Sequence, residues 1–195
     1  MLVDTGRPAN EVRRTFPCTY VWEPQIPTKV KFFMWSLLWD RLLTVDKLQR
    51  RGIVFPNRCC LCLVAEETMP HLFLSCRLSM EVWVNLLTVN IAARQALPSW
   101  RNTMDMLQNW PVFHSNEVAA DIWAILPYAI LWTIWQTRND VIFNGGTWDT
   151  NRVIQRIKAT VWGWLNMSLK SMELRKKFKF TDVLFGWRYV MTEQG

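Results

Sequence analysis

Four cysteines and a histidine form the part of this sequence that is best equipped for chemistry. The stretch CCLCLVAEETMPHLFLSC, residues 59–76, holds four of the five cysteines and one of the two histidines. Cys59 and Cys62 form a C-x2-C pair, which can turn two thiolates toward one ion from a tight loop, and His71 and Cys76 supply a second pair. Three sulfurs and one imidazole suit zinc among the common ions. We therefore predict one zinc ion, bound by Cys59, Cys62, His71 and Cys76.

Cys60 is a competing candidate for the first ligand position. We assign Cys59, because Cys60 and Cys62 leave only one residue between ligands. Cys60 is kept as an alternative ligand for a variant in which Cys59 is replaced. The alternative interpretation of the whole cluster is a group of buried thiols beside a core histidine, with no metal.

The predicted zinc is structural, and no catalytic residue is assigned. Four protein ligands complete a tetrahedron, whereas catalytic zinc keeps one position for water or substrate. Glu66 and Glu67 lie between the two ligand pairs. In a zinc hydrolase one of them would act as a general base. We interpret both as part of a solvated loop, because the ion would hold no water for them to activate.

Helices are expected on both sides of the cluster. Apolar residues at three- and four-residue steps predict a helix that starts near Thr28. A short helix is expected from Thr44 to Arg51 with Gly52 as its C-cap, and another follows Cys76 in RLSMEVWVNLL. Residues 53–55, IVF, are expected to form a very short strand.

The C-terminal half is also expected to be helical, with helices around residues 100–110, over 115–144 and over 150–172. The predicted fold class is therefore mostly α: a small zinc-stapled helical domain followed by a helical C-terminal region. The expected division is an irregular N-terminal segment (1–20), a zinc-binding domain (21–90) and a helical connector region with a basic tail (91–195).

The overall charge favours an acidic partner. The chain has 195 residues, a net charge of +7 and a pI of about 9.4, which suits nucleic acid or an anionic surface. The tail LRKKFKF offers a nucleic-acid contact through Arg175, Lys176, Lys177 and Lys179, with Phe178 or Phe180 stacking on bases. The alternative is a solvated helix end.

Neither the N-terminal residues nor the apolar segment predicts export or membrane insertion. The N-terminal residues lack the apolar run of a signal peptide, so we expect an intracellular protein of the nucleus or cytoplasm. Residues 122–137 carry no charge, but a membrane span needs about twenty such residues. We expect a buried helix there, with membrane insertion as the lesser alternative, and no small-molecule substrate.

Many of these residues occur in an order that resembles a known family. VWEPQIPTKVKFFMWSLLWDRLLTVDKLQRRGI followed by CCLCLVAEETMPHLFLSCRLSMEVW resembles the zinc-binding domain of plant non-LTR (LINE-type) retroelement reverse transcriptases. The similarity spans residues 21 to about 87, and the matching positions are Trp22, Pro27, Lys29, Val30, Phe33, Trp35, Arg41, Leu42, Thr44, Asp46, Arg51, Gly52, Cys59, Cys62, Glu67, Thr68, His71, Leu72, Phe73 and Cys76. Further on, LWTIWQTRNDVIFNGG, residues 131–146, resembles the connector that precedes an RNase H domain in these elements.

The resemblance implies a non-catalytic zinc-binding module derived from a retroelement polyprotein. The paired aspartates of a polymerase Tyr-x-Asp-Asp motif do not occur in the sequence, and the carboxylate set of RNase H is not expected in a chain of this length. We therefore predict no enzyme activity and weak RNA or DNA binding without strong sequence preference. The alternatives are a protein–protein interaction module with a structural zinc, or a non-functional retroelement remnant.

Overall fold

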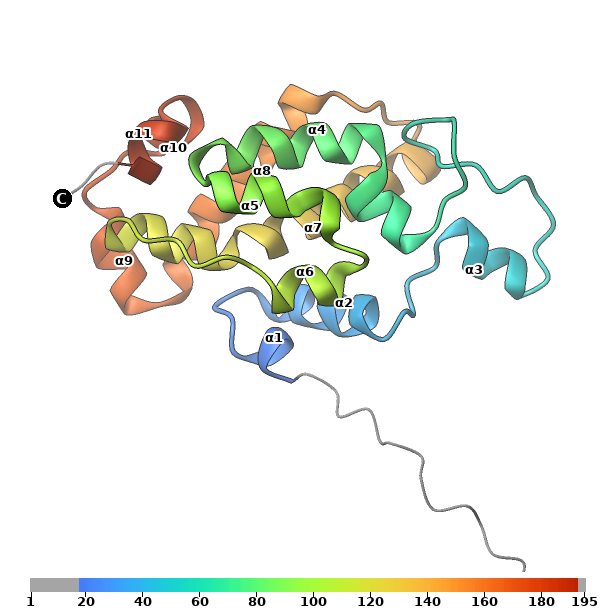
Figure 1. Cartoon of the computed structure of the whole chain (residues 1–195), viewed down its shortest axis with the longest axis horizontal. Helices are drawn as coiled ribbons and strands as arrows, with labels where there is room; N and C mark the ends of the chain where they lie inside the picture. The colour runs from blue at the N-terminus through green and yellow to red at the C-terminus, as the bar shows by residue number, and fades with distance from the viewer. Residues whose placement is uncertain (1–17, 193–195) are drawn as a thin grey trace, which may run out of the picture.

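The computed structural model describes residues 18–192, which fold into helices joined by loops, of which the segment between Arg50 and His71 is long (Figure 1). A single π-helical turn, η1, covers His71–Ser75. No strand occurs within the described residues, so the mostly α fold class is confirmed and the short strand expected at 53–55 is wrong. The α-helices are α1 (Thr19–Trp22), α2 (Thr28–Leu38), α3 (Val45–Arg50), α4 (Arg77–Leu86), α5 (Ile91–Ala96), α6 (Thr103–Gln108), α7 (Glu117–Asn144), α8 (Thr150–Trp164), α9 (Leu169–Arg175), α10 (Phe180–Phe185) and α11 (Trp187–Thr192).

The long helix α7 is the centre of the molecule. It runs through the middle of the view in Figure 1 and contacts α2, α4, α8, α9 and α11. The Asn116 side chain accepts a hydrogen bond from the Ala119 amide at its start, and Gly145 ends it in the left-handed conformation at φ 65°. By length and composition α7 could cross a membrane, but 72% of its apolar window is buried inside the molecule. The prediction of a buried helix at residues 122–137 is therefore confirmed.

A proline inside α7 is accommodated by a tryptophan from the preceding loop. Pro127 has no amide hydrogen, so the carbonyl of Trp123, four residues earlier, lacks its usual helical partner. The Trp110 indole Nε1 donates to that carbonyl at 3.2 Å, and the Trp123 indole donates to the Pro111 carbonyl at 2.7 Å. The two rings also stack with centroids 4.8 Å apart. Pro127 therefore leaves the helix unbroken.

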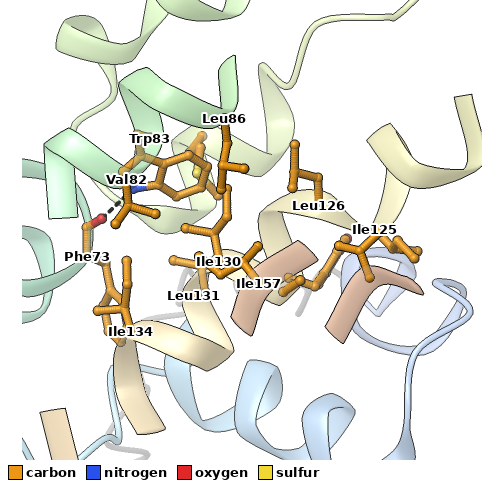
Figure 2. Close-up of a cluster of buried hydrophobic side chains, with 14 of the residues drawn as sticks. Phe73, Val82, Trp83, Leu86, Ile125, Leu126, Ile130, Leu131, Ile134 and Ile157 are labelled. Carbon is orange, nitrogen blue, oxygen red and sulfur yellow. Dashed lines mark hydrogen bonds between the residues drawn. The ribbon is translucent and has the colours of Figure 1, made fainter. Parts of the chain in front are cut away.

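The core joins residues from both halves of the chain. Figure 2 shows side chains of η1 and α4 packed against α7 and α8, and the Trp83 indole donates to the Phe73 carbonyl at 2.8 Å. The residues labelled there are Phe73, Val82, Trp83, Leu86, Ile125, Leu126, Ile130, Leu131, Ile134 and Ile157. One continuous apolar cluster therefore includes residues on both sides of position 90. The division of the chain at 20/21 and 90/91 stays a prediction.

Most of the expected helices are present with altered ends. The helix expected over 150–172 is in fact two, because α8 ends at Trp164 and α9 begins at Leu169, where Ser168 accepts from the Ser171 amide. Thr44 does precede α3, but its hydroxyl donates to Asp46 at 2.5 Å instead of capping the helix. Glu67 takes that role, since its Oε1 accepts from the Val45 amide at 3.0 Å.

Candidate metal centre

Two local structures bring the four predicted ligands together. Cys59 and Cys62 flank a tight turn, in which the Leu63 amide donates to the Cys59 carbonyl at 2.9 Å. His71 opens the π-helical turn η1, and the Cys76 amide closes it on the His71 carbonyl at 2.6 Å. A π-helical turn bonds residues five positions apart, which is the spacing of His71 and Cys76. Both turns therefore present their ligands to the same point.

The ligand atoms form a compact group. One ligand atom each from Cys59, Cys62, His71 and Cys76 lies within 4.8 Å of all the others. Cys62 Sγ is 3.4 Å from His71 Nε2, so Nε2 is the imidazole nitrogen that faces the sulfurs. Zinc–sulfur bonds of about 2.3 Å and zinc–nitrogen bonds of about 2.0 Å place S and N about 3.5 Å apart in a tetrahedron, and two sulfurs about 3.8 Å apart. The residues fit one zinc ion after small side-chain shifts.

The surroundings of the sulfurs favour a bound cation. Cys59 and Cys76 are fully buried, and Cys62 is nearly so. A hydrogen bond from Cys59 lowers the pKa of Cys76 to about 5, with help from the Leu78 and Ser79 amides at the start of α4. The same bond, together with burial, raises the pKa of Cys59. A cation held between these buried sulfurs would stabilise their thiolate forms.

Cys60 points away from the ligand group. Its Sγ lies 3.8 Å from Glu67 Oε2 and 3.9 Å from the Arg138 carbonyl oxygen. Burial and the nearby Glu67 carboxylate raise the pKa of Cys60 to about 12. The group of four contains Cys59 and not Cys60, so the geometry supports Cys59 as the first ligand.

A buried ion pair links the metal-binding loop to α7. Glu67 is completely buried, so its expected place in a solvated loop is wrong, whereas Glu66 is exposed. Arg138 Nη2 lies 2.5 Å from Glu67 Oε1, and Arg138 Nε lies 3.2 Å from Glu67 Oε2. Arg138 also donates to the Leu43 carbonyl at 3.3 Å. The carboxylate therefore joins the ligand loop, the start of α3 and α7 at one point.

Sequence reasoning missed this pair because its members are 71 positions apart. Local spacing says nothing about a contact at that separation. The signals available were a carboxylate inside the ligand loop and an arginine in an otherwise apolar helix. Arg138 donates to the Leu43 carbonyl, which lies in the loop between α2 and α3.

The four predicted basic contact residues lie at the junction of α9 and α10, and they differ in availability. Arg175 is 4.0 Å from the centroid of the Trp162 ring, and Lys176 pairs with Glu173 at 2.7 Å. Lys177 and Lys179 are exposed. Phe178 is half-buried against Tyr189, whereas Phe180 is 41% exposed.

Comparison with known proteins finds a described family that the segment around this centre resembles. Residues 7–83 match the family model described as zinc-binding in reverse transcriptase. The match includes all four ligand residues, so the predicted resemblance and the zinc cofactor are confirmed over this segment. The similarity of residues 131–146 to an RNase H connector stays a prediction.

A longer similarity links the chain to a plant protein. It is 25% identical over 154 residues to an Arabidopsis thaliana protein named "Putative ribonuclease H protein", and the alignment covers 78% of this chain and 24% of that protein. The chain thus spans about a quarter of that relative's length. No solved structure matches the chain.

Proposed function

We propose that this chain, whose residues 7–83 carry the reverse-transcriptase-type zinc-binding segment, is a non-catalytic module that binds one structural zinc and holds RNA or DNA weakly. The ligands are Cys59, Cys62, His71 and Cys76. The observation that carries the proposal is the convergence of their four ligand atoms within 4.8 Å in a buried setting.

The zinc would stabilise the fold and perform no reaction. Four protein ligands leave no position for water or substrate. Glu67, which lies between the two ligand pairs in the sequence, is hydrogen-bonded to Arg138. Both oxygens of this carboxylate already accept hydrogen bonds, one from Arg138 Nε and the other from Arg138 Nη2 and the Val45 amide, so the geometry does not present it to a water as a general base. These contacts support a non-catalytic role.

Nucleic acid is the proposed partner because of charge. The chain carries +7, and Lys177 and Lys179 are exposed on a turn that also exposes Phe180. Lysines that meet phosphates give affinity without sequence preference, and an aromatic ring can stack on any base. The relative's name and the reverse-transcriptase family support the same class of partner, in an intracellular setting, nuclear or cytoplasmic.

A polypeptide partner is the second candidate. Aliphatic side chains are exposed near the metal-binding turn, with Leu63 at 61% and Val64 at 81% exposure, and Val54 at 97%. Exposed apolar side chains of this kind mark interaction sites when they are grouped. A third outcome, a remnant without any partner, is the result if neither class of ligand binds.

A salt titration tests the nucleic-acid proposal. Zinc-loaded chain is titrated against fluorescent single-stranded and duplex oligonucleotides at several salt concentrations. The variant Lys177→Gln/Lys179→Gln should bind several-fold more weakly, and its plot of log affinity against log salt should lose about one unit of slope or more, since each phosphate contact adds close to one.

The matched control removes the same charge elsewhere. Arg94→Gln/Arg101→Gln also lowers the net charge by two, at exposed positions on and after α5. It should leave the slope unchanged. Undetectable binding of the unmodified, zinc-loaded chain at low salt would reject the nucleic-acid proposal and leave the structural zinc standing.

A further inference from the structure

A row of aromatic rings lies exposed along α2. Phe32 is 58% exposed, Trp35 42% and Trp39 41%, and Trp22 of the neighbouring α1 is 42% exposed. Positions 32, 35 and 39 fall on one face of a helix, over about 10 Å of its axis. We call these four residues the aromatic row. Large aromatic side chains are mostly buried, so a grouped set on one face indicates a binding surface.

The rings cannot turn inward, because the opposite face of α2 is already packed. Val30, Phe33, Met34 and Leu37 occupy the core side of the helix. Phe33 contacts Trp132 of α7 with centroids 5.2 Å apart. The aromatic row therefore stays at the surface when the molecule is folded.

A contact within the row orients two of its rings. The Trp22 and Phe32 rings are nearly perpendicular, with centroids 5.9 Å apart. Lys31 Nζ donates to the Trp22 carbonyl at 2.7 Å, which ties α1 to α2. Rings held in place lose little conformational freedom when a ligand binds.

Charged residues of both signs flank the row. Lys29 is exposed at the start of α2, with its Nζ 5.9 Å from the Trp132 ring centroid, and Arg41 is exposed just after the end of α2. Glu23 is exposed beside Trp22 at the α1 end. Asp40 is also exposed, but its carboxylate is paired with Lys47. Ser36 and Arg41 line a groove of about 610 Å³ that continues from this end of α2, and no carboxylate lines it among the described residues. A ligand with flat aromatic groups and negative charge complements this surface.

We propose that the aromatic row is a stacking surface for single-stranded nucleic acid, with Lys29 and Arg41 toward its phosphates. The choice of ligand class rests on the proposed function, but the row is a separate surface from the lysines at residues 177 and 179. Single strands are favoured over duplex, because bases in a duplex already stack on one another and hide their faces.

The test compares stacking with phosphate contact. Zinc-loaded chain is titrated by fluorescence anisotropy with labelled oligo(U)20 and with a 20-base-pair duplex, over a series of salt concentrations. Phe32→Leu/Trp35→Leu should weaken oligo(U)20 binding by about tenfold or more, while the salt slope stays unchanged and duplex affinity changes less than twofold. Trp35→Phe, which keeps a ring, should retain most of the affinity.

Controls separate this inference from loss of fold and from the proposed function. Phe185→Leu removes a ring that is more exposed (79%) than those of the aromatic row and lies far along the chain, and this variant should bind like the unmodified protein. Circular dichroism and zinc content confirm that each variant is folded; if the double variant is not, Trp35→Leu alone is compared with Trp35→Phe.

The outcomes are distinguishable. If the folded Phe32→Leu/Trp35→Leu variant binds oligo(U)20 normally while Lys177→Gln/Lys179→Gln binds weakly, the proposed stacking surface is rejected and the proposed function stands. The aromatic row is then a surface for a polypeptide. No binding of oligo(U)20 or duplex by the unmodified protein overturns both.

Discussion

At the scale of single residues, the contact between Glu67 and Arg138 has the largest expected effect on stability outside the ligands. Both side chains are almost completely buried, and the carboxylate also accepts from the Val45 amide. Removal of one partner leaves a buried charge without compensation, which costs about 3–5 kcal/mol.

We therefore expect Arg138→Ala to lower the free energy of unfolding by about 3–5 kcal/mol in urea titrations of the zinc-loaded protein. Glu66→Ala is the matched control in the same loop and should change it by less than about 0.5 kcal/mol, because Glu66 is exposed. A loss below about 1 kcal/mol for Arg138→Ala would show that the pair is solvated in solution.

Leu63 carries backbone strain beside the metal-binding turn. Its φ is 58°, in the left-handed region, and its side chain is 61% exposed. The left-handed conformation costs a residue with a Cβ about 1–2 kcal/mol of conformational strain, and glycine lacks this strain. Glycine in turn loses more conformational entropy on folding. Leu63→Gly should thus raise the unfolding free energy by about 0.5–1 kcal/mol, whereas Leu63→Val should lower it. The same sign for both variants would contradict the strained conformation.

At the scale of elements, α7 depends on a hydrogen bond from outside the helix. The Trp110 indole satisfies the Trp123 carbonyl that Pro127 leaves without an amide donor. Trp110→Phe keeps most of the ring and removes the donor. We expect it to cost about 1–3 kcal/mol of stability by leaving a buried carbonyl unpaired.

The same contact makes a double-mutant test possible. In a Pro127→Ala background the residue at 127 has an amide that can donate to Trp123, so Trp110→Phe should cost clearly less there. Chemical denaturation of the unmodified protein, the two single variants and the double variant gives the coupling free energy between residues 110 and 127. Equal costs in both backgrounds would mean that the indole and the proline act independently.

The elements also show what can be read from sequence. The apolar pattern predicts a helix over residues 115–144, and α7 begins two residues later, at Glu117. The C-x2-C spacing predicts which cysteines converge. The break at residues 165–168 and the capping of α3 by Glu67 were not predictable. Glu67 caps α3 only because the fold brings residue 67 next to residue 45. The spacing of apolar residues along the sequence does not predict such long-range contacts. Lys158 adds to the positive charge of the C-terminal third of the sequence, but it is buried and donates to the Leu184 carbonyl at 2.7 Å.

At the scale of the whole molecule, the zinc centre and the long helices share one core. The ligands Cys59, Cys62 and Cys76 belong to the same apolar cluster as α7 and α8. Arg138 adds a polar link between the ligand loop and α7. Loss of zinc should therefore destabilise parts of the structure well beyond residues 59–76.

We expect a strong chelator to lower the midpoint of thermal unfolding by roughly 10–20 °C, since several kcal/mol of binding energy is lost and each kcal/mol shifts a domain of this size by about 2–4 °C. Amide exchange should then rise in α3 and α4 and also near Arg138 in α7. Faster exchange confined to residues 59–76 would show that the metal loop is energetically separate from the bundle.

X-ray absorption at the zinc edge tests the central claim most directly, because it reports the atoms bound to the ion. The purified chain should contain one zinc with three sulfurs at about 2.3 Å and one nitrogen at about 2.0 Å, and with no oxygen. Cys60→Ser should give the same spectrum, and Cys62→Ser should lose it. An oxygen ligand in the unmodified protein, or a folded chain without zinc, would contradict a closed structural site made by Cys59, Cys62, His71 and Cys76.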